Sequence, residues 1–222
     1  MIRAQYFVSH VRPIALTALL LGAACSDDDS NSDPAIDAAP GVDSTVGAID
    51  ASNNTPDAAN NTPDGGSFGI VSSAYMEGGV IPDQHSCKGG INISPALMWS
   101  NAPDNTQSFA VVFLDTSGNT FLHSVIWDIP SSVTELAENI EKAYEPSNVA
   151  GAKQPNSYLG TRGYAGPCPL PVGTTHTYEF RLHALNVATL PGLSLNTSRE
   201  AVVAAIEAAS INSTALTASF TR

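Results

Sequence analysis

The sequence predicts a mainly β domain, folded as an antiparallel β-sandwich with one or two peripheral helices. Several short runs combine β-branched and aromatic residues, and two of them alternate cleanly between apolar and polar positions. Helical periodicity is confined to two short stretches, and no strand–helix–strand alternation is present. A parallel sheet would need that alternation, because crossover helices join its strands, so the antiparallel class is favoured.

The N-terminal residues 1–25 have the pattern of an export signal peptide. Arg3 and Arg12 provide its positive charge. The apolar stretch 14–24 is too short to span a bilayer as a mature helix. We therefore expect this segment to direct export and to contribute nothing to the fold.

The end of the signal peptide indicates a lipid anchor. It reads Leu21-Gly22-Ala23-Ala24-Cys25, which resembles a bacterial lipoprotein processing site with Cys25 as the lipidated residue. Cleavage of an ordinary secretory signal near Ala24 is the alternative. Ser26 comes next, which in a Gram-negative host resembles sorting to the outer membrane. We expect a protein of the cell envelope that contacts the membrane through Cys25.

Residues 26–67 are predicted to be a disordered acidic linker. They contain nine aspartates and no Lys, Arg or aromatic residue, so they cannot bury enough apolar surface to offset the entropy lost on ordering. The aspartates lack the central glycine and terminal glutamate of a calcium loop. The remaining residues 68–222 are expected to form one domain, whose 12 acidic and 7 basic residues give a net charge of −5. This charge does not indicate a nucleic-acid partner.

Five segments of the domain are predicted to be strands. One of them is apolar on both faces, as expected of a central strand that is buried on both sides. Another is stopped by Pro130, because proline cannot donate to a ladder. The last two alternate between apolar and polar residues, and the C-terminal one is expected to close the sheet. The five are residues 68–75, 107–115, 121–129, 177–186 and 213–222.

Two stretches are predicted to be helical. Thr197-Ser198-Arg199-Glu200 resembles a capping box, in which Thr197 and Glu200 would bind backbone amides at the start of a helix that ends at Ala209. Residues 132–143 are expected to form the second, shorter helix.

Two cysteines remain once Cys25 is assigned to the lipid. Cys87 and Cys168 form an even pair in an exported protein, which favours a disulfide over two buried thiols. A disulfide that closes so long a loop would stabilise the fold by about 4 kcal/mol.

A loop rich in Gly and Pro, residues 163–175, indicates a functional site. Long, stiff loops more often hold a site than serve as simple turns, and this one leads directly to His176 and Tyr178. Asp115 and His123 lie near the ends of two earlier predicted strands. We expect these four side chains to form a small pocket.

Four segments resemble, in their order and spacing, the phosphatidylethanolamine-binding protein family, specifically its bacterial branch named for Raf kinase inhibitor-like proteins. They correspond to the family's D-G-x-N-x-S-P-x-L-x-W, D-P-D-x-P, H-W-x-x-x-x-I-P and G-P-x-P-P-x-G-x-H-x-Y patterns. The resemblance covers essentially all of residues 68–222. The four segments are residues 87–99, 108–115, 123–130 and 163–178.

The resemblance implies an antiparallel β fold with a small anion pocket at one end. Protonated imidazoles and a tyrosine hydroxyl donate hydrogen bonds to a phosphate-like anion, and a neighbouring carboxylate keeps a histidine charged and oriented. Rigid prolines hold the donors in place. The expected ligand is a small anionic or phosphorylated molecule. The matching ligand-binding positions are Asp115, His123, Pro169, His176 and Tyr178.

Three positions depart from the family's patterns. Asp115 is followed by Thr116-Ser117-Gly118-Asn119, without the second acid and the proline. Ser124 replaces the tryptophan that follows the histidine, which removes an aromatic wall. The spacer at residues 170–175 is longer than in the family and would change the rim. We expect the pocket to persist, whereas the ligand preference does not transfer.

Each candidate also has a structural interpretation. His123 and His176 could simply hold loops, Asp115 could cap the turn that follows it, and Tyr178 could belong to the core. Four other residues are interpreted as structural or as core, with the tryptophans alternatively forming a pocket wall: His85, His183, Trp99 and Trp127.

The preferred function is that of a lipid-anchored binding protein with an anion pocket. The alternative is a protease inhibitor or another protein-interaction module of the same fold. An enzyme is not expected, because no G-x-S-x-G pattern is present and the histidines lack the H-x-x-H or H-x-H spacing of a metal site. We expect no cofactor and no metal.

Overall fold

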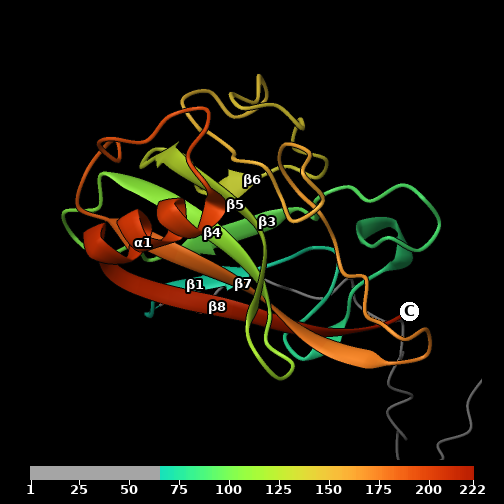
Figure 1. Ribbon diagram of the computed structural model, residues 1–222. Helices are drawn as coiled ribbons and strands as arrows, with labels where there is room; N and C mark the ends of the chain where they lie inside the picture. The colour runs from blue at the N-terminus through green and yellow to red at the C-terminus, as the bar shows by residue number, and fades with distance from the viewer. Residues whose placement is uncertain (1–65) are drawn as a thin grey trace, which may run out of the picture. The chain divides into compact units, whose positions relative to one another are not determined.

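The computed structural model describes residues 66–222 (Figure 1). The predicted signal peptide, the lipidated Cys25 and almost all of the predicted linker lie outside the described residues. The strands are β1 (Gly69–Val71), β2 (Gly79–Val80), β3 (Leu97–Ser100), β4 (Ser108–Asp115), β5 (Phe121–Pro130), β6 (Glu135–Leu136), β7 (Thr175–Leu185) and β8 (Ser210–Thr221). The helices are the 3-10 turn η1 (Asp83–His85) and α1 (Arg199–Ala209).

The strands form two sheets, as the predicted sandwich requires. The larger sheet has the order β2-β8-β7-β4-β5 and the smaller one has the order β1-β3-β6. Every neighbouring pair is antiparallel except the short β2–β8 pair. The five predicted strands are all present with shifted ends, and β8 does not close the sheet, because β2 pairs with its outer edge.

Strand β4 is buried on both faces, as its apolar sequence predicts. Phe109, Val111 and Phe113 pack into the core shared with the smaller sheet. The side chains between them belong to a second cluster that includes Val202 and Ile206 of α1. The helix therefore covers the face of the larger sheet opposite the smaller one (Figure 1).

Helix α1 begins one residue later than the predicted capping box implies. Its N-cap is Ser198, whose hydroxyl accepts a hydrogen bond from the Ala201 amide at 3.2 Å. Glu200 therefore sits in the first turn and forms an ion pair with Arg199 instead of completing a box with Thr197. The prediction of a helix here is confirmed, and the prediction of its cap is wrong by one position.

The prediction of a second helix at residues 132–143 is wrong. The structure has the two-residue strand β6 in this segment, with Leu136 opposite Leu97 and Glu135 opposite Met98 of β3. Leu136 is buried in the core between the sheets. Pairing with β3 therefore outweighs the local helix preference of this segment, as tertiary contacts often do.

The four residues interpreted as structural or as core are all buried. His85 lies close to the Ile93 carbonyl, with Nδ1 and the oxygen 3.0 Å apart, and His183 Nδ1 lies 3.0 Å from the Ser210 hydroxyl. Trp99 is buried in the core between the two sheets, and Trp127 is buried in the cluster that includes α1.

His183 should make the fold sensitive to acid. Burial, followed by the positive charge of Arg181, lowers its pKa to about 4 from an ordinary 6.5. The unfolded chain thus binds a proton that the folded chain does not, and stability falls as the pH drops from about 6.5 to about 4. In urea unfolding at pH 7 and pH 4, a His183→Gln variant is expected to lose up to about 3 kcal/mol less free energy than the wild type. Equal losses in both proteins would contradict this assignment.

Candidate functional site

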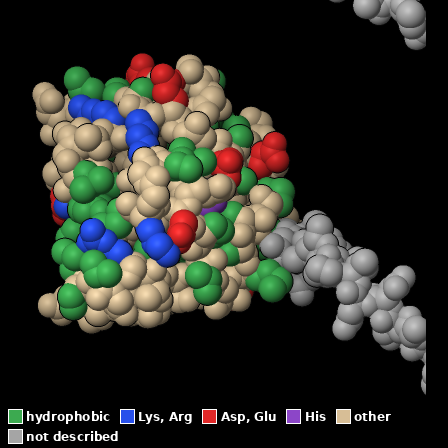
Figure 2. Space-filling model, turned by 90° about the vertical axis from the view of Figure 1, so that its right-hand side faces the viewer, with side chains coloured by type: hydrophobic (Ala, Val, Ile, Leu, Met, Phe, Trp, Pro, Cys, Tyr) green, Lys and Arg blue, Asp and Glu red, His purple; other side chains and the backbone are tan. Residues whose placement is uncertain are grey.

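The predicted site residues meet in one pocket of about 360 Å³ at the end of the larger sheet. They come from the end of β4, the start of β5, the start of β7 and the loop before it. Figure 2 shows a face of the molecule on which a histidine side chain reaches the surface among hydrophobic and acidic side chains. The lining residues are Asp115, Ser117, Asn119, Phe121, His123, Tyr158, Cys168, Pro169, Leu170, His176 and Tyr178.

Asp115 contacts His176 directly. The β4–β7 register places Asp115 opposite Tyr178, two residues from His176 on the same face of the strand. His176 Nδ1 donates to Asp115 Oδ2 at 2.6 Å, and the Ser117 amide donates to Asp115 Oδ1 at 2.8 Å. Asp115 therefore caps the turn that follows it and also orients a pocket histidine. His176 Nε2 makes no hydrogen bond with a described residue and is available to a ligand.

His123 differs from its expected charged state. Its Nδ1 donates to the Ala165 carbonyl at 3.1 Å, and its ring packs against the aromatic rings of Phe113 and Tyr178. Burial holds the pKa of His123 below its usual range, although the Ala165 carbonyl and the charge of Asp115 act in the opposite direction. At neutral pH the pocket therefore contains one neutral imidazole, because desolvation disfavours the cation.

The Tyr178 hydroxyl is buried and makes no hydrogen bond of regular geometry with a described residue, but Asp115 and the Cys168 backbone lie within its reach. Burial, followed by the negative charge of Asp115, raises the pKa of this hydroxyl, so it remains a neutral donor. Because Tyr178 lines the pocket beside Asp115, its hydroxyl lies among the polar groups that a molecule in the pocket would meet.

The loop that lines the pocket is held by the segment around η1. The Tyr164 hydroxyl donates to the His85 carbonyl at 2.7 Å, and the Gly166 amide donates to Asn92 Oδ1 at 2.8 Å. His123 binds the carbonyl of Ala165, which lies between these two anchor points. The same loop therefore shapes the pocket and positions one of its histidines.

The predicted disulfide between Cys87 and Cys168 is confirmed. Their Cα atoms are 5.4 Å apart, and 81 positions separate them along the chain. The Cys87 amide also donates to the Pro167 carbonyl at 3.0 Å. The disulfide thus ties the pocket loop, directly before Pro169, to the segment after η1.

Tyr158 is a pocket residue that sequence reasoning missed. Its ring lies edge-on to His123, with centroids 4.7 Å apart, and contacts the Phe121 ring at 5.4 Å. Its amide donates to the His123 carbonyl at 3.1 Å. Tyr158 lies in an irregular segment without strand or helix periodicity, so no local pattern could have placed it here.

In the described part of the chain, few charged side chains line the pocket. None of the lining residues is Lys or Arg. Residues 66–222 contain no group of three or more His, Cys, Asp or Glu side chains placed to hold a metal ion. No helix within these residues is long and apolar enough to cross a membrane. The pocket therefore offers hydrogen-bond donors, aromatic rings and one paired carboxylate.

Comparison with known sequences decides the family. The sequence profile described as phosphatidylethanolamine-binding protein matches residues 71–221. The chain belongs to this family. The match covers the whole larger sheet, so the family's fold accounts for the strands that build the pocket.

Several known proteins are similar to this chain. A UPF0098 protein of Aquifex aeolicus is 38% identical over 135 residues, which are 60% of this chain and 76% of that protein. A candidate lipoprotein, LppC of Mycobacterium tuberculosis, is 38% identical over 122 residues, which are 54% of this chain and 56% of LppC. The crystal structure of Escherichia coli YbcL, described as a new member of the mammalian PEBP family, has a TM-score of 0.63 and 27% identity and covers 71% of this chain and 99% of YbcL. The predicted family and fold class are confirmed.

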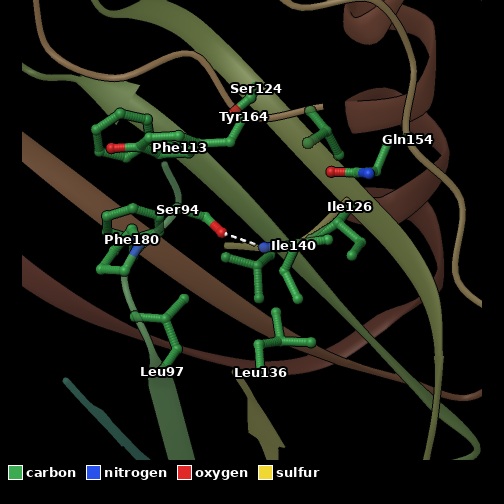
Figure 3. A pocket seen from close by; sticks show the side chains of 13 residues that line it. Ser94, Leu97, Phe113, Ser124, Ile126, Leu136, Ile140, Gln154, Tyr164 and Phe180 are labelled. Atoms are coloured by element: carbon green, nitrogen blue, oxygen red, sulfur yellow. Dashed lines mark hydrogen bonds between the residues drawn. The ribbon is translucent and has the colours of Figure 1, made fainter. Parts of the chain in front are cut away.

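A second, small cavity lies beside Ser124. Ser124, which replaces the family's tryptophan, lines this mostly apolar cavity of about 30 Å³ between the sheets (Figure 3). Phe113 and Tyr164 lie beside Ser124 in this cavity, and Ser94 accepts a hydrogen bond from the Ile140 amide at 2.8 Å. The aromatic wall of the pocket is provided by Tyr158 instead.

Proposed function

We propose that this protein is a lipid-anchored binding protein whose pocket takes the phosphate or phosphoryl group of a small ligand. The observation that carries the proposal is the convergence of the Tyr178 hydroxyl and His176 Nε2 on one pocket, in which Asp115 holds His176 through Nδ1. Hydrogen-bond donors that converge in a buried site favour an acceptor-rich ligand such as a phosphoryl group. The proposed activity is binding alone, without a cofactor or a catalytic step.

The charges in the pocket favour a phosphoryl group that carries a cation of its own. Asp115 is already paired with His176, His123 is neutral near pH 7, and no Lys or Arg lines the pocket. The rings of Phe121 and Tyr158 can contact an ammonium group through cation–π attraction. We therefore propose phosphorylated amines as the preferred ligand class over inorganic phosphate.

This proposal is tested by histidine chemical shifts during titration with phosphorylethanolamine. The shifts are expected to centre on His123 and His176 and to be absent from His183, which lies outside the pocket lining. A His176→Ala variant is expected to bind at least about tenfold more weakly, since one charge-assisted bond is lost. Asp115→Asn should weaken binding through the orientation of His176. No shift in either pocket histidine up to millimolar ligand would refute the proposed function.

The anchor is the second part of the proposal. We propose lipidation at Cys25 and an outer-membrane location in a Gram-negative host, supported by the processing-site pattern and by the similarity to the candidate lipoprotein LppC. The mass of the mature N-terminal peptide tests it. An unmodified cysteine, or cleavage elsewhere, would refute the anchor.

A further inference from the structure

The pocket mouth carries aliphatic side chains that remain in solvent. Leu170 is 67% exposed and Val172 is 71% exposed, with Pro171 between them. Phe121, 45% exposed, lines the same pocket as Leu170. Leu170 and Val172 belong to the spacer at residues 170–175, and Phe121 begins β5. Exposed apolar groups gathered at a binding pocket typically mark an interaction surface.

The loop that bears these side chains is fixed at both ends. Cys168 is held by the disulfide at its start. At its end, the Gly173 amide donates to the Arg222 carbonyl at 2.8 Å, and the Thr174 hydroxyl donates to the Pro171 carbonyl at 2.7 Å. With these anchors the apolar tip, defined as residues 170–172, stays beside the pocket in the folded protein.

We infer that the apolar tip docks on a phospholipid bilayer, with Leu170 and Val172 in the interface while the pocket takes a lipid phosphoryl headgroup. This inference rests on the proposed function. Aliphatic side chains enter the boundary between headgroups and acyl chains because burial removes their apolar surface from water. A headgroup in the pocket would contact Leu170, which belongs to both the tip and the pocket lining.

Arg222 supports a lipid as the occupant. In the β7–β8 register, His176 faces Phe220 and Tyr178 faces Ala218, so side chains two positions apart on β8 share the pocket face. Arg222 directly follows β8, its carbonyl accepts a hydrogen bond from the Gly173 amide at 2.8 Å, and its positive charge acts on the Tyr158 hydroxyl. This cation lies beside the tip, where it would meet the phosphate layer. The net charge of −5 on residues 68–222 favours a zwitterionic lipid surface over an anionic one.

The length of the preceding chain makes a bilayer the nearest partner. The predicted anchor at Cys25 is separated from the domain by residues 26–67. The disordered linker that the sequence predicts would have a root-mean-square span of about 35 Å. The anchored domain therefore meets the bilayer at a high effective concentration, and a weakly inserting tip is sufficient.

Quenching of tryptophan by brominated lipids tests the docking. The mature lipidated chain is reconstituted in vesicles of phosphatidylethanolamine and phosphatidylcholine with brominated acyl chains. Trp99 and Trp127 are 3% and 0% exposed and give a constant background. A Val172→Trp variant is expected to be quenched at least about twofold more than an Ile211→Trp control. Ile211 is 41% exposed and lies at the other end of β8 from the pocket.

A second variant and a parallel titration separate the possible outcomes. Adding Leu170→Asp to Val172→Trp should reduce the quenching to that of the control. Equal quenching of the Val172→Trp and Ile211→Trp proteins, including the case in which another protein covers the tip, overturns the docking. Histidine shifts with soluble phosphorylethanolamine but no quenching would overturn the docking alone. Quenching without those shifts would overturn the proposed ligand pocket and the headgroup part of this inference, and would retain only the contact of the tip with the bilayer.

Discussion

A Gly166→Ala variant is expected to lose roughly 3 kcal/mol or more of unfolding free energy and to lose the pocket as well. A Cβ at this position would lie 2.0 Å from the His85 carbonyl oxygen and 2.9 Å from Asn92 Oδ1. Both neighbours belong to the segment that holds the pocket loop, and a backbone carbonyl cannot move aside without shifting η1. The glycine is required by this close approach of two backbones and not by its own backbone angles.

Gly173 provides the matched control in the same loop. A Cβ there would have no atom within 4 Å, and the only cost is its φ of +92°. A Gly173→Ala variant is therefore expected to lose only about 1–2 kcal/mol. Urea unfolding of the two variants and the wild type makes the comparison, with phosphorylethanolamine titration as the second readout. Similar losses in both alanine variants would contradict the assigned role of Gly166.

Removing the disulfide is the second change with a large expected effect. A Cys87→Ala/Cys168→Ala double variant is expected to lose about 4 kcal/mol of unfolding free energy, because the unfolded chain regains the freedom of a loop that spans 81 positions. The pocket should also loosen, since Cys168 lines it next to Pro169.

Urea unfolding with and without reductant measures this effect. Reductant should bring the wild type to the stability of the double variant and should leave the double variant unchanged. A wild type whose midpoint does not respond to complete reduction would show that the disulfide does not contribute to stability. Thiol titration of the unfolded, non-reduced protein provides the control, because two free thiols would mean that the bond had not formed.

Some parts of the fold follow from local patterns. The uninterrupted apolar run of β4 predicts burial on both faces, and Pro130 marks the end of β5. The alternation in β7 and β8 predicts which side chains enter the core, including Phe180 and Phe220. These predictions succeed because strand periodicity and the missing amide of proline are properties of a few neighbouring residues.

Other parts depend on contacts that the local sequence does not contain. The sequence of residues 132–143 predicts a helix. The pairing of Leu136 with β3 and its burial in the core stabilise a strand there instead. The sequence predicts protonated imidazoles in the pocket, but burial lowers the pKa of His123 more than the nearby charge of Asp115 raises it. Tyr158 enters the pocket from an irregular segment, and only the fold brings it against His123.

The sequence by itself determined the sandwich class, the pairing of Cys87 with Cys168 and, through the family resemblance, the five residues of the predicted pocket. Only the tertiary structure decided that Asp115 holds His176 at 2.6 Å, that His123 is neutral, and that the tip at residues 170–172 stays exposed. The physical reason is that periodicity and motif spacing are local, whereas desolvation and hydrogen-bond partners depend on segments up to tens of residues apart in the chain.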